Sequence, residues 1–291
     1  MSPTTLLARE PVTPLGKMVR RVQDISTLPH VAVQVMKVAA DANATATDLK
    51  RIMESDPALS ARVLRCVNSS AYALRTKITN LQRAIAFLGM KQIRNLAMTA
   101  AVSALFQKDE AIGGYRRSLL WSHLISVGLC SRMIAMRIRE PEFEDMFLAG
   151  LLHDIGIVLE DQFAHNQFVQ LLQGLSADRS LADQERDVFG FDHASLGAEL
   201  AAAWGFPECV RAAIRFHHAS DASRGPEARV VQCVELANVL CTAKGHTSIG
   251  LRLVRLVPSL LASLALGKDD VAVLLEDLEA HLAANANLFQ I

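Results

Sequence analysis

Apolar residues along most of the chain recur every three or four positions, which is the period of an amphipathic helix. After the Leu28-Pro29 turn, for example, Val31, Val35 and Val38 share one face. No stretch alternates apolar and polar residues with the period of two that a half-buried strand requires. The pattern therefore predicts an all-α fold.

Residues that start and stop helices interrupt this pattern at short intervals. Asp56 followed by Pro57 predicts a helix start, because an aspartate side chain caps free amides and a proline needs no donor in the first turn. Asn80 starts a further helix, which Gly89 ends. The helices that we predict span residues 31–39, 48–55, 57–68, 81–88, 93–106, 118–139, 143–155, 193–204, 208–217, 229–242, 251–264 and a last segment after Asp269.

A polar and glycine-rich segment marks the boundary between two helical halves. It consists of Lys108-Asp109-Glu110 followed by Gly113-Gly114. The short connections between helices favour a compact, two-part helical bundle over a solenoid. The parts that we predict are an N-terminal tail (1–19), an N-terminal helical half (20–112), a second helical half (113–245) and a C-terminal helical extension (246–291).

Composition narrows the class of protein. Thirty basic and thirty acidic residues give a formal net charge of +0, which argues against a broad surface for nucleic acid or an acidic membrane. The five cysteines occur singly, without a CxxC pair, as expected for reduced thiols in a cytoplasmic protein. Residues 1–17 lack the features of a secretory signal, and apolar runs such as 260–266 are shorter than the roughly 18 residues of a membrane span. We therefore predict a cytoplasmic protein with no nucleic-acid or membrane partner.

Histidines carry the candidate chemistry. Five of the nine lie inside or at the ends of predicted helices, where their side chains can converge: His123, His153, His193, His217 and His218. Asp154 follows His153 directly, and neighbouring residues on a helix project about 100° apart. The pair can therefore face one ion only at a helix end, and we expect Gly156 to supply that end.

Imidazoles and a carboxylate from several helices that point into one cavity are typical of a metal site. Two metal ions there would polarise a phosphoryl oxygen and generate hydroxide from water near neutral pH. The alternative is a polar cavity without metal, since a single histidine on an apolar face is more often a satisfied core residue. We interpret the histidines without convergent partners as structural: His30, His165, His246 and His281.

The order of these motifs resembles the HDOD domain family, a helical signalling module related to the HD superfamily of metal-dependent phosphohydrolases. The resemblance runs from about residue 20 to about residue 245, and the second half has the HD-like signature. The spacing H…HD…H…HH is similar to that of the HD-GYP branch, which hydrolyses cyclic di-GMP. The segments that carry the resemblance are 28–29, 55–65, 68–69, 84–89, 148–156, 191–194, 204–207 and 217–218.

The resemblance implies a ligand set for one or two metal ions. His123 corresponds to the first ligand, and His153 and Asp154 to the central pair, in which Asp154 can bridge two ions and is the candidate catalytic residue. The residues that would complete the second ion's shell are His193, His217 and His218. A ligand set rich in nitrogen suits Fe, Mn, Ni or Zn better than Mg.

Three departures from the related families bear on activity. The final aspartate of the HD signature falls at Asn238, and a neutral amide is a poorer cation ligand. Ile157 replaces the lysine that follows the HD pair in HD-GYP proteins, which removes a phosphate-contacting charge. Residues 219–226 do not contain the GYP loop.

The resemblance implies a bacterial signal-transduction module that acts by binding a ligand or partner, either a signalling protein or a nucleotide-like small molecule. The alternative function is a metal-dependent phosphohydrolase or phosphodiesterase acting on a nucleotide or cyclic dinucleotide. A third interpretation makes the pocket vestigial and the protein an interaction scaffold. Arg62 and Arg65, three residues apart on one predicted helix, are weak candidates for lining a cleft between the halves; the other interpretation places them on a solvated face.

Overall fold

The computed structural model describes residues 13–25, 30–41, 43–68, 74–107, 109–254 and 258–286. Its regular structure is helical except for a two-stranded antiparallel hairpin of β1 (Ala111–Ile112) and β2 (Tyr115–Arg116). This confirms the predicted all-α fold class. The Leu28-Pro29 turn, Ser69 of the 68–69 motif and Lys108 of the predicted boundary lie outside the described residues.

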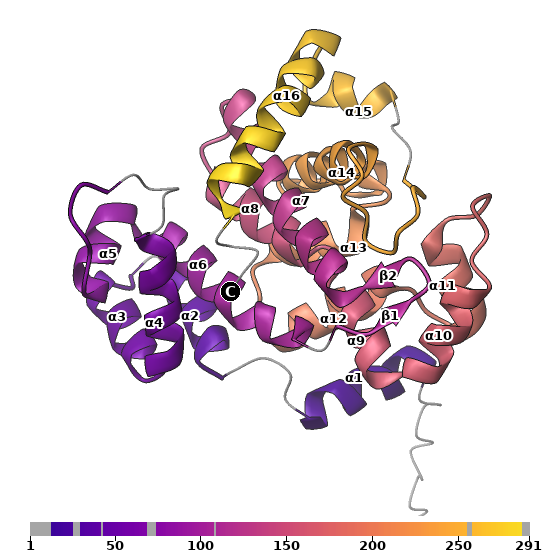
Figure 1. The fold of residues 1–291 in the computed structure, drawn as a ribbon, viewed down its shortest axis with the longest axis horizontal. Helices are drawn as coiled ribbons and strands as arrows, with labels where there is room; N and C mark the ends of the chain where they lie inside the picture. Colours follow the sequence, from indigo (N-terminus) through magenta and orange to yellow (C-terminus); the bar gives the residue numbers. More distant parts are fainter. Residues whose placement is uncertain are drawn as a thin grey trace, which may run out of the picture.

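Two groups of helices lie side by side (Figure 1). The first group contains α2 (His30–Ala40), α3 (Ala46–Glu54), α4 (Pro57–Val67), α5 (Leu81–Leu88) and α6 (Met90–Val102). The second contains α7 (Arg117–Arg137), α8 (Phe143–Leu152), α9 (Ile155–Phe163), α10 (His165–Gln173), α11 (Leu181–Phe189), α12 (His193–Ala203), α13 (Glu208–Phe216), α14 (Ala228–Ala243), α15 (Pro258–Ser263) and α16 (Lys268–Ala284). The groups meet where α6 packs against α8, and Arg94 of α6 forms a 2.8 Å ion pair with Asp145 of α8.

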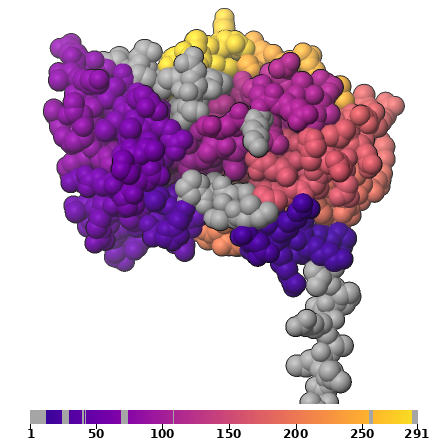
Figure 2. Space-filling view, turned by 60° about the horizontal axis from the view of Figure 1, so that its bottom comes forward, coloured from indigo at the N-terminus to yellow at the C-terminus, as the bar shows by residue number. Residues whose placement is uncertain are grey.

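The N-terminal helix α1 (Pro14–Ile25) belongs to the second group rather than to the first. It packs on α9 and α12, and Figure 2 shows it lying against that part of the molecule. The tail boundary predicted after residue 19 falls inside this helix, so residues 14–19 are not a separate tail. The boundary predicted after Ile112 falls at the turn of the β1–β2 hairpin.

Helix ends are set by local hydrogen bonds, as the sequence indicated. The Asp56 carboxylate accepts a 2.9 Å hydrogen bond from the amide of Leu59, with Pro57 in the first turn of α4. Asn80 caps α5 in the same way, and Gly89 at its end has φ +82, a backbone conformation that glycine adopts without a steric cost. These two predicted starts are confirmed.

The helix predicted over 143–155 is wrong in one respect that matters for the site. Two helices occupy this stretch: α8 ends at Leu152, and α9 begins at Ile155. Gly156 therefore lies in the first turn of α9 and does not end a helix. A Cβ on this glycine would lie 2.0 Å from the carbonyl oxygen of His193, so the missing side chain permits the close approach of α12.

Two further differences lie elsewhere in the second group. Residues 251–254 are not helical, and the predicted helix over 251–264 is reduced to α15. Helices α10 and α11 occupy a stretch for which we predicted none. Both carry polar residues on most positions, and only Phe168 and Leu171 of α10 are buried.

Helix α7 forms the centre of the second group and packs against α8, α14 and α16. By length and composition it is the one helix in the described part of the chain that could cross a membrane, so our expectation that no segment qualifies is wrong by that criterion. However, 78% of its most apolar stretch is buried inside the bundle, as in the core helix of a helical domain.

Candidate metal centre

The structure brings all six predicted ligand residues together in the second helix group. His123 projects from the middle of α7, and His153 and Asp154 occupy the break between α8 and α9. His193 is the first residue of α12, a start that Asp192 caps by accepting a hydrogen bond from Ser195. The remaining members follow the last residue of α13; they are His217 and His218.

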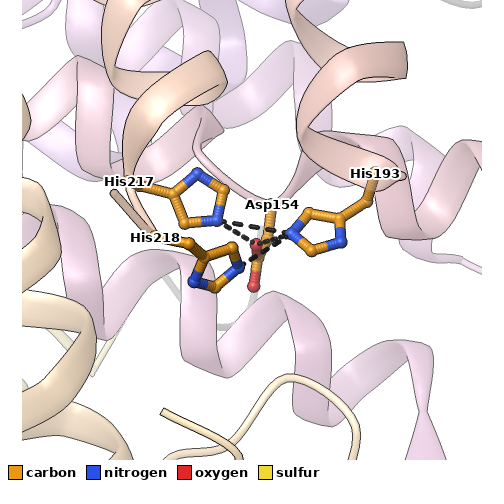
Figure 3. A group of neighbouring side chains, drawn as sticks. All are labelled: Asp154, His193, His217 and His218. Carbon is orange, nitrogen blue, oxygen red and sulfur yellow. Dashed lines mark hydrogen bonds and ion pairs between the residues drawn. The ribbon is translucent and has the colours of Figure 1, made fainter. Parts of the chain in front are cut away.

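The Asp154 carboxylate lies between two sets of imidazoles. Its Oδ2 atom is 3.5 Å from Nε2 of His123 and 3.3 Å from Nε2 of His153. Its Oδ1 atom is 3.3 Å from Nε2 of His193 and 3.1 Å from Nε2 of His217. We call His123, His153 and Asp154 the inner site, and Asp154 with the histidines of Figure 3 the outer site; these histidines are His193, His217 and His218.

Backbone and carboxylate acceptors fix which ring nitrogen carries the proton. In four of the rings Nδ1 points onto an oxygen that accepts its hydrogen: His123 onto His246 O (2.8 Å), His153 onto Gly150 O (2.7 Å), His193 onto Glu185 Oε2 (2.6 Å) and His217 onto Ile214 O (2.9 Å). In a neutral ring the proton then sits on Nδ1, and the lone pair sits on Nε2. The Nε2 lone pairs of all four rings therefore point toward Asp154.

Lone pairs that face each other require a cation or a proton between them. The Nε2 atoms of His123 and His153 lie 3.3 Å apart, and those of His193 and His217 lie 3.4 Å apart. Nitrogen ligands about 2.0–2.1 Å from one ion lie roughly 3.0–3.4 Å from each other, depending on coordination geometry. Asp154 Oδ1 is buried and without a hydrogen-bond partner among the described residues, so the group has the donors and spacing of a metal site.

The electrostatics of the cluster favour a cation. Burial by itself raises the pKa of Asp154, but the positive charge and the Nε2 hydrogens that the surrounding histidines offer when they are protonated hold that pKa well below its usual range. Burial lowers the pKa of His217, which favours its neutral, metal-binding form. Burial also acts to lower the pKa of His193, yet the carboxylates of Glu185 and Asp154 outweigh it and raise that pKa well above its usual value. A metal ion at the outer site would replace this proton.

The two sites differ in their access to solvent. All three residues of the inner site are buried. The outer site includes the exposed His218 and borders a cavity of about 610 Å³, whose lining contains Asp154, His193 and His218. A small molecule in this cavity can therefore reach the outer site directly, while the inner site is closed.

The weaker candidates fall in different places. Asn238 is buried and lines the same cavity, where its Oδ1 accepts a 3.4 Å hydrogen bond from the Thr242 hydroxyl. Arg62 and Arg65 lie on α4 in the first helix group, and neither lines the cavity. The structure therefore does not bring these two arginines to the histidine cluster.

One residue that contacts the cluster escaped the sequence analysis. Glu185 of α11 is fully buried, and its Oε2 accepts hydrogen bonds from both the backbone amide and Nδ1 of His193. In the sequence, Glu185 is surrounded by polar residues, as on a solvated helix face. Only the packing of α11 against α12 brings its carboxylate to His193. His165, which we interpreted as structural, donates to Asp161 outside the cluster.

Comparison with known proteins identifies the family. The sequence model of the HDOD domain matches residues 25–220, a region that contains both helix groups as far as His218. The chain belongs to the HDOD domain family. The HDOD match ends before α14, so Asn238 lies outside it.

Solved structures share the fold of this HDOD chain. An HDOD domain protein of unknown function from Geobacter sulfurreducens is 24% identical, with a TM-score of 0.76 over 94% of this chain and 96% of that one. A proposed phosphohydrolase from Shewanella amazonensis is 21% identical, with a TM-score of 0.70 over 94% of this chain and 97% of that one. A proposed signal-transduction protein from Marinobacter aquaeolei is 24% identical, with a TM-score of 0.77 over 94% of this chain and 65% of that one.

Among curated proteins, an uncharacterised protein of Treponema pallidum is 25% identical over 201 residues. The match covers 68% of the HDOD chain but 38% of that protein, so the chain spans less than half the length of this relative. These similarities establish the fold and family, and the function of the site rests on its own geometry.

Proposed function

We propose that the chain is a signal-transduction module that binds one or two divalent transition-metal ions and senses a small ligand at the outer site. One observation carries the proposal: four Nε2 lone pairs, fixed by acceptors behind the rings, face a single buried carboxylate. A group of this kind is costly to bury without a cation, because both the carboxylate and the lone pairs lack donors.

The residues present fit a transition metal better than Mg²⁺. The inner site offers two imidazoles and one carboxylate oxygen, and the outer site offers three imidazoles and the other oxygen. This nitrogen-rich set suits Fe, Mn, Ni or Zn. The hydrogen bond from His193 to Glu185 is the arrangement that orients a metal-binding histidine and increases its basicity.

The neighbouring residues favour binding over turnover. Asn238 contributes a neutral amide where the HD signature has a carboxylate, which leaves the outer site with less negative charge. Ile157 is fully buried and apolar, so it cannot contact a phosphate group. An ion held by the remaining ligands can still bind a ligand that enters through the cavity.

A second function is favoured by the position of Asp154. Its two oxygens face separate sets of imidazoles, as a carboxylate bridging two ions would, and the cavity gives a phosphoester access. When bound, two such ions polarise a phosphoryl oxygen and lower the pKa of water. The alternative is therefore a phosphohydrolase or phosphodiesterase acting on a nucleotide or cyclic dinucleotide, in which Asp154 holds both ions in place.

Metal analysis tests the proposal. Protein purified without chelator is expected to contain about one to two equivalents of transition metal, and Asp154→Ala to lose them, because Asp154 belongs to both sites. His165→Ala is the matched control, since His165 bonds to a carboxylate outside the cluster. Less than about a tenth of an equivalent in the wild-type chain contradicts the proposal and favours a vestigial polar pocket.

Turnover assays separate the two functions. We expect the Mn- or Fe-loaded chain to bind without hydrolysing cyclic dinucleotides or generic phosphodiesters. Hydrolysis that disappears in Asp154→Ala but persists in Arg62→Ala would establish the phosphohydrolase instead, because Arg62 lies in the other helix group.

A further inference from the structure

Two arginines in the cavity beside the outer site have no protein partner. Arg215 and Arg252 both line the cavity and are exposed, and neither guanidinium group makes an ion pair or hydrogen bond with any residue that the structure describes. The other two lining arginines are already engaged: Arg179 pairs with Asp187 at 2.7 Å, and Arg186 pairs with Asp183 at 2.5 Å and with Asp192. Arg215 and Arg252 are therefore available to a ligand.

The positions of these two arginines are set by the elements that build the metal centre. Arg215 lies in the last turn of α13, and His218 follows the end of this helix three residues later; both residues line the cavity. The buried Ile214 beside it offers its carbonyl to His217. The Arg215 side chain therefore starts next to the exposed ligand of the outer site.

Arg252 lies in the segment that follows α14, and this segment is held at two points. The carbonyl of His246 accepts the Nδ1 hydrogen of His123. Gly250, with φ +83, approaches the hairpin so closely that a Cβ there would lie 2.6 Å from the carbonyl oxygen of Gly114. These two contacts lie a few residues before Arg252 in the chain. They fix the segment in place, so the Arg252 side chain lies at the cavity wall without any movement of the segment.

The charge balance of the cavity depends on the metal. Its lining contains four arginines and five carboxylates, those of Asp154, Asp178, Asp183, Asp192 and Glu235. Protonated His193, which also lines the cavity, offsets the excess carboxylate, so one divalent ion that replaces its proton changes the net charge of the lining from about zero to positive. The ion, Arg215 and Arg252 then form three positive groups around one space, which favours a ligand with an oxyanion.

We propose that Arg215 and Arg252 form an oxyanion-binding subsite beside the outer site, which holds a phosphate or carboxylate group of the ligand. The planar guanidinium fork matches either group with two parallel hydrogen bonds. This inference rests on the proposed function in one respect, because the lining becomes positive only when a metal ion is bound. The two unpaired arginines are present whether or not a metal ion binds.

Calorimetric titration of the full, Mn-loaded chain tests the subsite, with inorganic phosphate and malonate as separate probes. Each of Arg215→Gln and Arg252→Gln is expected to weaken binding of the preferred probe about tenfold at low salt, and the double variant about a hundredfold. A loss confined to phosphate identifies a phosphate-bearing ligand, and a loss confined to malonate identifies a carboxylate. Arg224→Gln is the matched control, because Arg224 is exposed, has no partner in the described residues and does not line the cavity.

Metal content distinguishes failure of the subsite from failure of the metal centre. The arginines are not ligands, so the double variant is expected to hold as much metal as the wild type. Unchanged affinity of the double variant for both probes, or no binding of either probe by a metal-loaded wild type, overturns the subsite. If the wild type holds no metal but the double variant still binds phosphate or malonate more weakly, the subsite stands and the proposed metal function fails.

Discussion

The inner and outer sites share Asp154 but differ in how their other ligands are held. In the inner site, His123 and His153 donate to backbone carbonyls, and both rings are fully enclosed. In the outer site, His193 donates to the Glu185 carboxylate, and His218 is exposed to the cavity. One carboxylate thus links a closed position, suited to a permanently bound ion, to an open position where a ligand can complete the coordination.

The largest effect is expected from Gly156→Ala, which alters the close contact between α9 and α12 beside Asp154 and His193. The new Cβ would lie 2.0 Å from the His193 carbonyl oxygen, so α9 and α12 must separate. We expect a loss of about 3 kcal/mol or more in the free energy of unfolding, together with loss of the outer ion. Gly174→Ala is the control, since its Cβ would be 3.4 Å from its nearest neighbour, and chemical denaturation should show a change below about 1 kcal/mol.

Histidine substitutions on either side of Asp154 test whether the sites are separable. His153→Ala should remove the inner ion and destabilise the chain by about 2 kcal/mol, because it empties a fully enclosed position. His218→Ala should weaken only the outer ion and change the free energy of unfolding by about 0.5 kcal/mol or less, because the ring is exposed. Metal stoichiometry and thermal unfolding measure both effects. Equal losses of metal in the two variants would show that the sites act as one.

Substitution of Glu185 tests the carboxylate behind the outer site. Glu185→Gln should weaken metal binding at the outer site about 10- to 100-fold and leave the inner ion in place, because Glu185 contacts His193 alone among the ligands. Competition with a metal-binding dye measures the affinity. Asp187→Asn on the same helix is the control, as Asp187 is exposed and pairs with Arg179. A similar loss of metal affinity in this variant would contradict the proposed support of His193 by Glu185.

The last prediction concerns the pH dependence of stability and a carboxylate outside both sites. Although burial acts to raise the pKa of Asp161, hydrogen bonds from Arg117, His165 and Tyr115 lower it below its usual value. A carboxylate with a lowered folded-state pKa stabilises the chain above its unfolded-state pKa, near 4, and loses that contribution as the pH falls. We expect Asp161→Asn to reduce the free energy of unfolding by about 1 kcal/mol at pH 7, with the difference from wild type shrinking below pH 4. A difference that stays constant with pH would contradict this ion pairing.

Much of the site could be predicted because its residues stand at helix ends. Asp192 caps α12, and the capped end places His193 at the first helical position, both of which are local features of the sequence. The His153-Asp154 pair was predicted to lie at a helix end, and the structure places it between the end of α8 and the start of α9. The cause assigned to that break was wrong, because Gly156 serves the approach of α12 to α9 rather than the end of α8.

The sequence by itself determined the helical class and the capped starts of α4 and α5, and it singled out the six residues of the cluster, since these depend on residues a few positions apart and on ligand chemistry. Only the tertiary structure decided that Asp154 has a closed and an open side, that Glu185 supports His193, and that Arg215 and Arg252 share a cavity. These features join helices that are far apart in the chain, and their side-chain directions follow from how the helices pack, which no local pattern of residues encodes.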